Sequence, residues 1–157
     1  MVKEYLRKLG ITFKIFKHDA VFTVEEAKKQ QTYNEIRGHT KNLFLKDKGG
    51  EDFYLVILSA EKKLDIEKLS LYLSCKLKFA NQGELYKILK IKPGCVGPFA
   101  LINDEELKVK VLIDEEVWMN DFVGFHPNIN TETLELNRDD FHRYINSLKN
   151  RIEVVKL

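Results

Sequence analysis

Residues 43–58 read Leu43-Phe44-Leu45-Lys46-Asp47, then Lys48-Gly49-Gly50-Glu51, and, after Asp52, Phe53-Tyr54-Leu55-Val56-Ile57-Leu58. Two apolar runs on either side of a short Gly-Gly segment are typical of a β-hairpin. We therefore expect strands over residues 43–47 and 53–58, joined by a tight turn. This hairpin begins a sheet around which the other elements are arranged.

Upstream of the hairpin, the sequence carries helix signals at two points. Gly10 follows a short amphipathic stretch and is typical of a helix end, and Thr23 followed by Glu26 is a capping-box pattern that predicts a helix start. Residues 12–16 lie between these two points and alternate like a strand.

Downstream, helices and strands are expected to alternate. Asp65 and Asn81 are expected to cap two helices that cover one face of the sheet, and Asn137 to cap a last helix. Residues 108–113 and 133–136 have the alternation of strands. The pattern predicts a single α/β domain over residues 1–157, with a mixed sheet and flanking helices.

Composition limits the class of protein. A chain of 157 residues has room for one core, and 44% apolar with 32% charged residues is usual for a soluble globular protein. No run of about eighteen apolar residues predicts a membrane span. The charged amino terminus, Met1–Arg7, lacks the apolar stretch of a signal peptide, which favours a cytoplasmic protein.

The charge and the cysteines exclude further classes. A net charge of +2 and a pI of about 8.4 favour local contact with a few phosphates, not a DNA-binding domain. Cys75 and Cys95 are too few for a disulfide scaffold, so we expect reduced thiols. No metal site is expected, because the four histidines are far apart in sequence and lack carboxylates at ligand spacing.

Three segments carry candidate chemistry. The first is His39-Thr40-Lys41-Asn42-Leu43-Phe44-Leu45, in which a strand would carry Lys41 toward a pocket mouth. The second is Pro93-Gly94-Cys95-Val96-Gly97-Pro98-Phe99, and the third is Phe125-His126-Pro127-Asn128-Ile129-Asn130-Thr131.

Together, these segments resemble the YbaK/prolyl-tRNA-synthetase-associated family of aminoacyl-tRNA editing domains. The resemblance also includes Phe16–Ala27, Lys78-Phe79-Ala80 and Leu101–Asp104, in the family's order and spacing, and extends from about residue 10 to residue 148. Within the family, the chain is most similar to the free-standing ProX or PrdX branch.

The resemblance implies a curved, barrel-like sheet and the hydrolysis of mischarged alanyl-tRNA(Pro), without a cofactor. It implies the acceptor end of tRNA(Pro) as partner, with prolyl-tRNA synthetase as a second one. The sequence shows no evident synthetase or anticodon-binding domain, so we expect action in trans. The family's functional lysine falls at Lys41, and its loop histidine at His126.

An aminoacyl ester is already activated, so its hydrolysis needs an oriented water and a stabilised oxyanion more than a strong nucleophile. Lys41, Gly94 and His126 are the candidate catalytic residues: Lys41 supplies charge, Gly94 allows close backbone approach, and His126 orders its loop or contacts the substrate. The candidate substrate-binding residues are Asn42, Val21, Phe22, Phe79, Gly97, Pro98, Phe125 and Asn128.

Each assignment has an alternative. The four apolar candidates Val21, Phe22, Phe79 and Phe125 could belong to the core, and Cys95 with His126 as base would give a thiol nucleophile, a reading we disfavour. The substrate could be cysteinyl-tRNA(Pro), as in the YbaK branch. The chain could also be a non-catalytic tRNA- or synthetase-binding module of the same fold.

Overall fold

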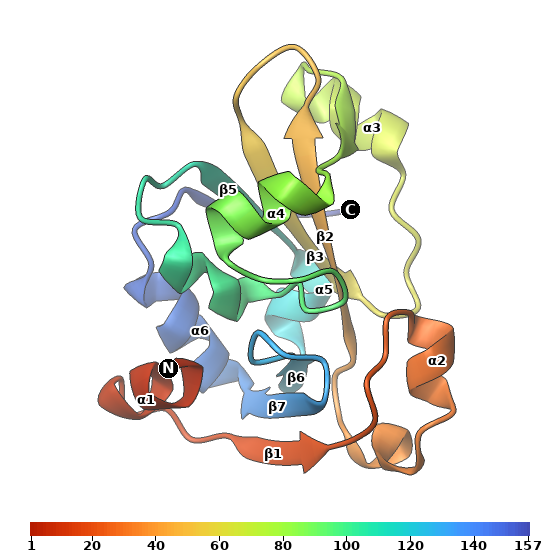
Figure 1. The fold of residues 1–157 in the computed structure, drawn as a ribbon, viewed down its shortest axis with the longest axis vertical. Helices are drawn as coiled ribbons and strands as arrows, with labels where there is room; N and C mark the ends of the chain where they lie inside the picture. The colour runs from red at the N-terminus through yellow and green to blue at the C-terminus, as the bar shows by residue number, and fades with distance from the viewer.

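The strands form two sheets in the computed structural model, which describes all 157 residues (Figure 1). The larger sheet has five strands in the order β4-β2-β3-β5-β8, and the smaller has three in the order β1-β7-β6. The strands are β1 Lys14–Lys17, β2 Thr40–Asp47, β3 Phe53–Ser59, β4 Leu77–Phe79, β5 Val109–Asp114, β6 Phe122–Phe125, β7 Glu132–Asn137 and β8 Ile152–Val155.

Six α-helices and two 3-10 helices surround the sheets. They are α1 Val2–Lys8, α2 Val24–Lys28, η1 Gln31–Glu35, α3 Ile66–Leu73, α4 Gln82–Leu89, η2 Pro98–Asn103, α5 Glu115–Met119 and α6 Arg138–Ser147. The mixed α/β architecture expected from the sequence is confirmed. None of the helices has the length and the apolar character needed to span a bilayer.

The expected hairpin is confirmed, and β2 begins at Thr40, before the expected start at Leu43. Strands β2 and β3 pair antiparallel from Thr40–Ser59 to Lys46–Phe53. Strand β3 also pairs parallel with β5, which pairs parallel with β8. The central residues of β3 are all buried, as expected of a strand covered on both faces.

The two faces of the larger sheet bury separate cores. Successive side chains on a strand point to opposite faces, and Phe44 belongs to one core whereas Leu45 belongs to the other. Helix α4 packs Leu89 against the core of Phe44, and α3 packs Leu69 against the core of Leu45. The expectation that both helices cover one face is therefore wrong.

The expected helix starts are confirmed by their caps. The side chains of Thr23, Asp65, Asn81 and Asn137 each accept a hydrogen bond from the backbone N–H three residues on. At Asn81 the capping box is complete, with Glu84 bonded back to the Asn81 N–H. Strands β4, β6 and β8, helix α5 and the two 3-10 helices were not expected; all are short.

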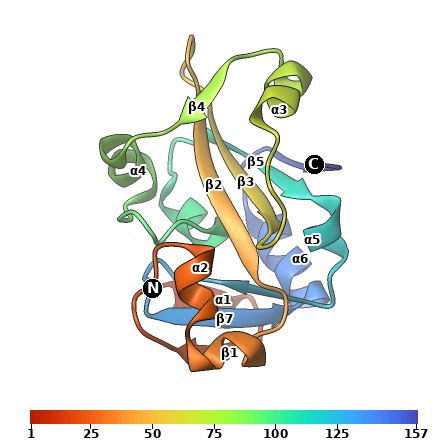
Figure 2. The same ribbon diagram turned by 90° about the vertical axis from the view of Figure 1, so that its right-hand side faces the viewer.

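A pair of glycines joins the two sheets. The Gly124 N–H on β6 donates to the Gly38 carbonyl at 2.9 Å, and His39 forms an isolated bridge with Gly124. Gly38 has φ +73°, and a Cβ placed there would lie 1.8 Å from the Phe122 carbonyl oxygen. The sheets meet here without forming a closed ladder, so the expected barrel-like closure is not seen. In Figure 2, β7 and β1 cross the lower end of β2 and β3.

Candidate functional site

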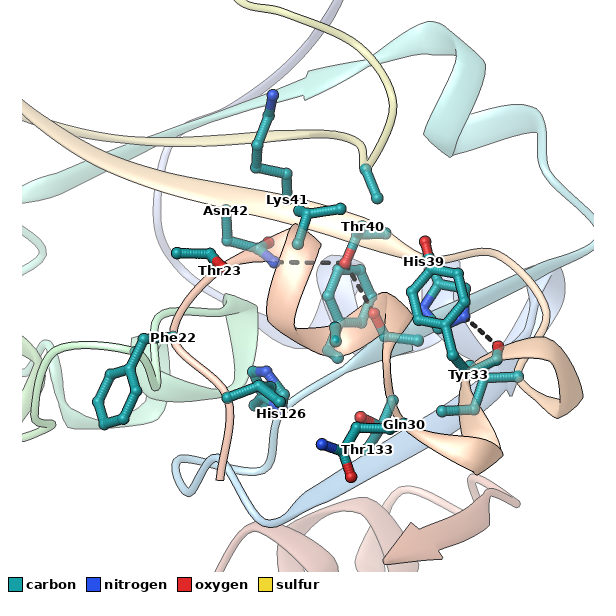
Figure 3. A pocket seen from close by; sticks show the side chains of 18 of the residues that line it. Phe22, Thr23, Gln30, Tyr33, His39, Thr40, Lys41, Asn42, His126 and Thr133 are labelled. Carbon is teal, nitrogen blue, oxygen red and sulfur yellow. Dashed lines mark hydrogen bonds between the residues drawn. The ribbon is translucent and has the colours of Figure 1, made fainter. Parts of the chain in front are cut away.

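A cavity of about 450 Å³ lies where the lower end of β2 meets β6, β7 and residues 21–36. Its volume is in the range of small-molecule sites. One side, which we call the sheet wall, is formed by residues 40–42 of β2 together with His126 and Thr133. The opposite side belongs to residues 22–35, which carry α2 and η1 and which we call the outer segment (Figure 3).

His126 is held as a neutral acceptor. Its Nδ1 lies 2.9 Å from the Glu132 carbonyl oxygen, and since a carbonyl only accepts, Nδ1 carries the proton. Nε2 is then left with a free lone pair. Burial lowers the pKa of His126 below its ordinary value, and the nearby His18 ring, 5.7 Å away, lowers it further.

His18 is fixed in the same way. Its Nδ1 lies 2.9 Å from the Asp19 carbonyl, and its Nε2 lies 2.8 Å from Thr133 Oγ1. A carbonyl only accepts, so Nδ1 donates to Asp19, and Nε2 is hydrogen-bonded to the Thr133 hydroxyl. His18 therefore supports the wall beside His126.

Thr40 and Asn42 form a polar row on β2. Thr40 Oγ1 donates to the Gly124 carbonyl at 2.7 Å, and Asn42 Nδ2 donates to Thr40 Oγ1 at 3.3 Å. Asn42 Oδ1 is buried without a hydrogen-bond partner. An unpaired buried acceptor of this kind costs about 1–3 kcal/mol, so the residue favours a ligand that brings a donor.

Lys41 borders the cavity, but its ammonium turns away from this row. Its neighbours Thr40 and Asn42 point to the other face of β2, and Figure 3 shows Lys41 directed away from His126. The Lys41 Nζ donates to the Lys62 carbonyl, and Lys62 Nζ in turn contacts buried Asp114 at 2.8 Å.

The turn at Pro93-Gly94 brings backbone into the cavity. Gly94 has φ +85°, and a Cβ there would lie 2.6 Å from Cδ1 of Phe22. The N–H groups of Gly94 and Val96 donate to no other group of the protein. Cys95 between them is buried in the core, and burial raises the pKa of its thiol. A protonated thiol that faces the core is a weak nucleophile, which argues against Cys95 as the attacking group.

The outer segment has few attachments. Val21 and Ile36, which flank it, are buried, and none of residues 22–35 is. The Val21 carbonyl accepts from Asn130 Nδ2 at 3.1 Å, and Tyr33 stacks on His39 with 3.7 Å between ring centroids. Burial lowers the pKa of His39.

Seven of the predicted site residues line the cavity: Lys41, Gly94, His126, Asn42, Val21, Phe22 and Phe125. The other four do not. Phe79 is exposed on β4, Pro98 is buried and accepts from Tyr144 through its carbonyl, Gly97 lies behind the His126 backbone, and Asn128 occupies a turn with φ +65°.

Five further polar or aromatic residues line the cavity and were not among the predicted site residues: His18, Thr40, His39, Tyr33 and Thr133. His39 and Thr40 stood inside the first quoted segment, where strand alternation could have placed Thr40 beside Asn42. Nothing in the sequence pairs Tyr33 with His39.

Comparison with known proteins identifies the family of this chain. The model of the aminoacyl-tRNA editing domain matches residues 18–144. The prolyl-tRNA editing protein ProX of Acetoanaerobium sticklandii is 35% identical over 97% of this chain and 93% of its own length. Prolyl-tRNA synthetase associated domain-containing protein 1 of Bos taurus is 32% identical over 92% of this chain and 86% of its own.

Among solved structures, a candidate trans-editing enzyme for prolyl-tRNA synthetase superposes with a TM-score of 0.72. It is 18% identical and covers 99% of this chain and 94% of its own, a likeness that concerns the fold. The segments that line the cavity lie within the matched range. The chain belongs to the aminoacyl-tRNA editing domain family.

Proposed function

We propose that this protein is a trans-editing hydrolase that removes alanine from mischarged alanyl-tRNA(Pro). The observation that carries the proposal is the cavity, in which the neutral His126, the unpaired Asn42 oxygen and the free Gly94 N–H come together. The match to ProX over nearly the whole of both chains supports prolyl-tRNA editing and action in trans.

The reaction follows from these groups. His126 Nε2 orients a water toward the ester carbonyl and takes its proton as it attacks; when the tetrahedral intermediate collapses, His126 returns that proton to the departing ribose oxygen. The N–H groups of Gly94 and Val96 are available to stabilise the oxyanion, in the manner of other acyl-transfer sites. Asn42 Oδ1 accepts from the α-ammonium group of the amino acid. The products are alanine and free tRNA.

Lys41 has an electrostatic role in this proposal. It borders the cavity, and a lysine side chain can exchange the Lys62 carbonyl for a phosphate of the tRNA acceptor end by rotating about its own bonds. Lys41→Ala should lose most deacylation and keep its stability, with partial rescue by arginine. Lys48→Ala, an exposed lysine in the hairpin turn, is the matched control.

Selectivity would come from size. A synthetase pocket shaped for proline rejects the smaller alanine by only about 1–3 kcal/mol, so a second site that admits alanine and excludes proline completes the selection. Excluding proline by overpacking costs roughly 1–3 kcal/mol, which corresponds to about fivefold to a hundredfold in rate.

One assay tests the proposal. Purified protein is given alanyl-, cysteinyl-, seryl- and prolyl-tRNA(Pro) at equal concentration, with chelator present. Alanyl-tRNA(Pro) should be hydrolysed fastest and prolyl-tRNA(Pro) slowest. Faster cysteine release would assign the cysteinyl substrate, equal rates on all four would mean a nonspecific esterase, and no hydrolysis would favour a binding module.

A further inference from the structure

Phe22 is an exposed aromatic residue held in a fixed place. Its side chain lines the cavity, yet the residue is 64% exposed. Its N–H donates to Glu26 Oε2 at 2.9 Å, and the preceding Val21 is buried with its carbonyl bonded to Asn130. The peptide group that precedes Phe22 is therefore anchored through both its carbonyl and its N–H, while the ring remains in contact with solvent.

The Phe22 ring lies against Gly94, with Cδ1 and Cε1 as its nearest atoms. A Cβ on Gly94 would lie 2.6 Å from Cδ1 and 3.1 Å from Cε1, so only a glycine lets the ring lie this close to the turn. The residue is largely exposed, so much of the ring is open to solvent. A ring supported on one side and otherwise open suits a second planar group.

The position of Phe22 separates it from the hydrolytic groups. In Figure 3, Phe22 lies at one end of the cavity, apart from Asn42, Thr40 and His126. An exposed aromatic ring beside a site is a platform on which the bases of single-stranded nucleic acid stack.

We propose that Phe22 stacks on the terminal base of the acceptor end and so holds the nucleoside while the ester reaches His126. This inference rests on the proposed function, and it replaces the prediction that Phe22 contacts the side chain of the amino acid. A phenyl ring contacts the face of a base and not the hydrogen-bonding groups on its edge. This subsite should therefore bind any base and should not discriminate between bases.

The first test is binding of uncharged RNA. A short acceptor-stem hairpin ending in CCA is compared with the same hairpin carrying an abasic terminal nucleotide. Wild type should bind the CCA hairpin more tightly. Phe22→Ala should lose about fivefold to a hundredfold on the CCA hairpin, the range of base–aromatic stacking, and nothing on the abasic one.

Three further variants separate stacking from packing. Phe22→Trp should retain base-dependent binding, and Phe22→Leu, which still covers Gly94, should lose it. Tyr86→Ala removes a similarly exposed ring, 62% accessible on α4, and should bind like wild type. Equal binding of the two hairpins by wild type, or full binding by Phe22→Leu, would overturn the proposal.

The second test uses deacylation. If Phe22 holds the base, Phe22→Ala slows alanyl- and cysteinyl-tRNA(Pro) by the same factor, whereas a side-chain contact would change their ratio. A changed ratio with unchanged RNA binding overturns the proposal. Base-dependent binding that is lost in Phe22→Ala would support the subsite even in a protein without deacylase activity, so the two proposals fail separately.

Discussion

The two walls of the cavity differ in what holds them. The sheet wall belongs to β2, β6 and β7. These strands are hydrogen-bonded within the two sheets and pack on the buried core. The outer segment has no buried residue between Phe22 and Glu35. Segments with few buried contacts open locally at lower free energy than the whole fold. The sheet wall can therefore keep reacting groups in place while the outer segment yields to an incoming substrate.

The strongest test of this difference is His126→Ala on the sheet wall. Loss of the water-orienting group should lower deacylation about 10² to 10⁴-fold, the usual contribution of acid–base catalysis. The Glu132 carbonyl loses its donor, so we expect the free energy of unfolding to fall by only about 1 kcal/mol. Both are measured on one preparation, by deacylation of alanyl-tRNA(Pro) and by urea unfolding.

His142→Ala is the control for that variant. His142 also has a ring nitrogen near a backbone carbonyl, at 2.8 Å from Trp118 O, but it lies on α6 outside the cavity. Its deacylation rate should stay within about twofold of wild type. A His126→Ala rate within a few-fold of wild type would remove the role given to this side chain.

Gly94→Ala should disturb the outer segment, because Phe22 belongs to that segment and rests on this glycine. A side chain at φ +85° should cost roughly 1–2 kcal/mol of stability. The displaced Phe22 ring should lower the deacylation rate by about tenfold, which corresponds to roughly 1.4 kcal/mol. Gly83→Ala on α4 is the control, with its nearest contact at 3.4 Å, and should lose neither property. A fully stable and fully active Gly94→Ala protein would contradict the proposed close approach.

Lowering the pH should act through two histidines. Burial lowers the pKa of both His126 and His39 in the folded protein. Below pH of about 6.5 these two histidines take up protons in the unfolded chain but stay neutral in the folded protein. The free energy of unfolding should therefore decrease as pH falls and level off below the lowered pKa values. Deacylation should decline at the lower end of this range, as pH falls through the lowered pKa of His126, because protonated His126 cannot accept from water.

The pH effect is checked with urea midpoints and with rates corrected for spontaneous ester hydrolysis. In His126→Gln the residual rate should lose this acid limb. Persistence of the limb in that variant would assign it to another group.

The smallest effect is expected on the outer segment. Lys28 forms an ion pair with Glu61 at 3.0 Å, and both side chains are largely in water. Exposed pairs contribute little to stability. Lys28→Ala should leave the urea midpoint unchanged, whereas Lys62→Ala, which removes the charged partner of buried Asp114, should lower it clearly. Equal shifts would mean that the two regions are not as different as their burial indicates.

The parts of the fold that could be predicted from the sequence depend on local patterns of residues. The four caps and the Gly-Gly hairpin depend on residues within a few positions of one another, and all were confirmed. The prediction that α3 and α4 cover the same face of the sheet was wrong. Strand β2 points Phe44 and Leu45 to opposite faces, and the sequence of a helix does not indicate which face the helix covers.

Prediction of the site from the sequence is limited in the same way, because long-range contacts cannot be predicted from local patterns. Seven predicted residues line one cavity because their segments follow the family's order. The direction of Lys41 depends on the Lys62 carbonyl, and the open face of Phe22 depends on Gly94, some seventy residues away. Such long-range contacts leave no periodic trace in the chain.

The close contact between the two sheets at Gly38 limits the mutations that the protein can tolerate. At Gly38 an added carbon would meet the backbone oxygen of Phe122, which no side-chain rotation can move. His39 and Thr40 follow immediately, so an error at this joint would misplace the sheet wall as well. In a scan of every codon, missense changes at position 38 should be depleted as severely as stop codons, although the residue itself touches no substrate.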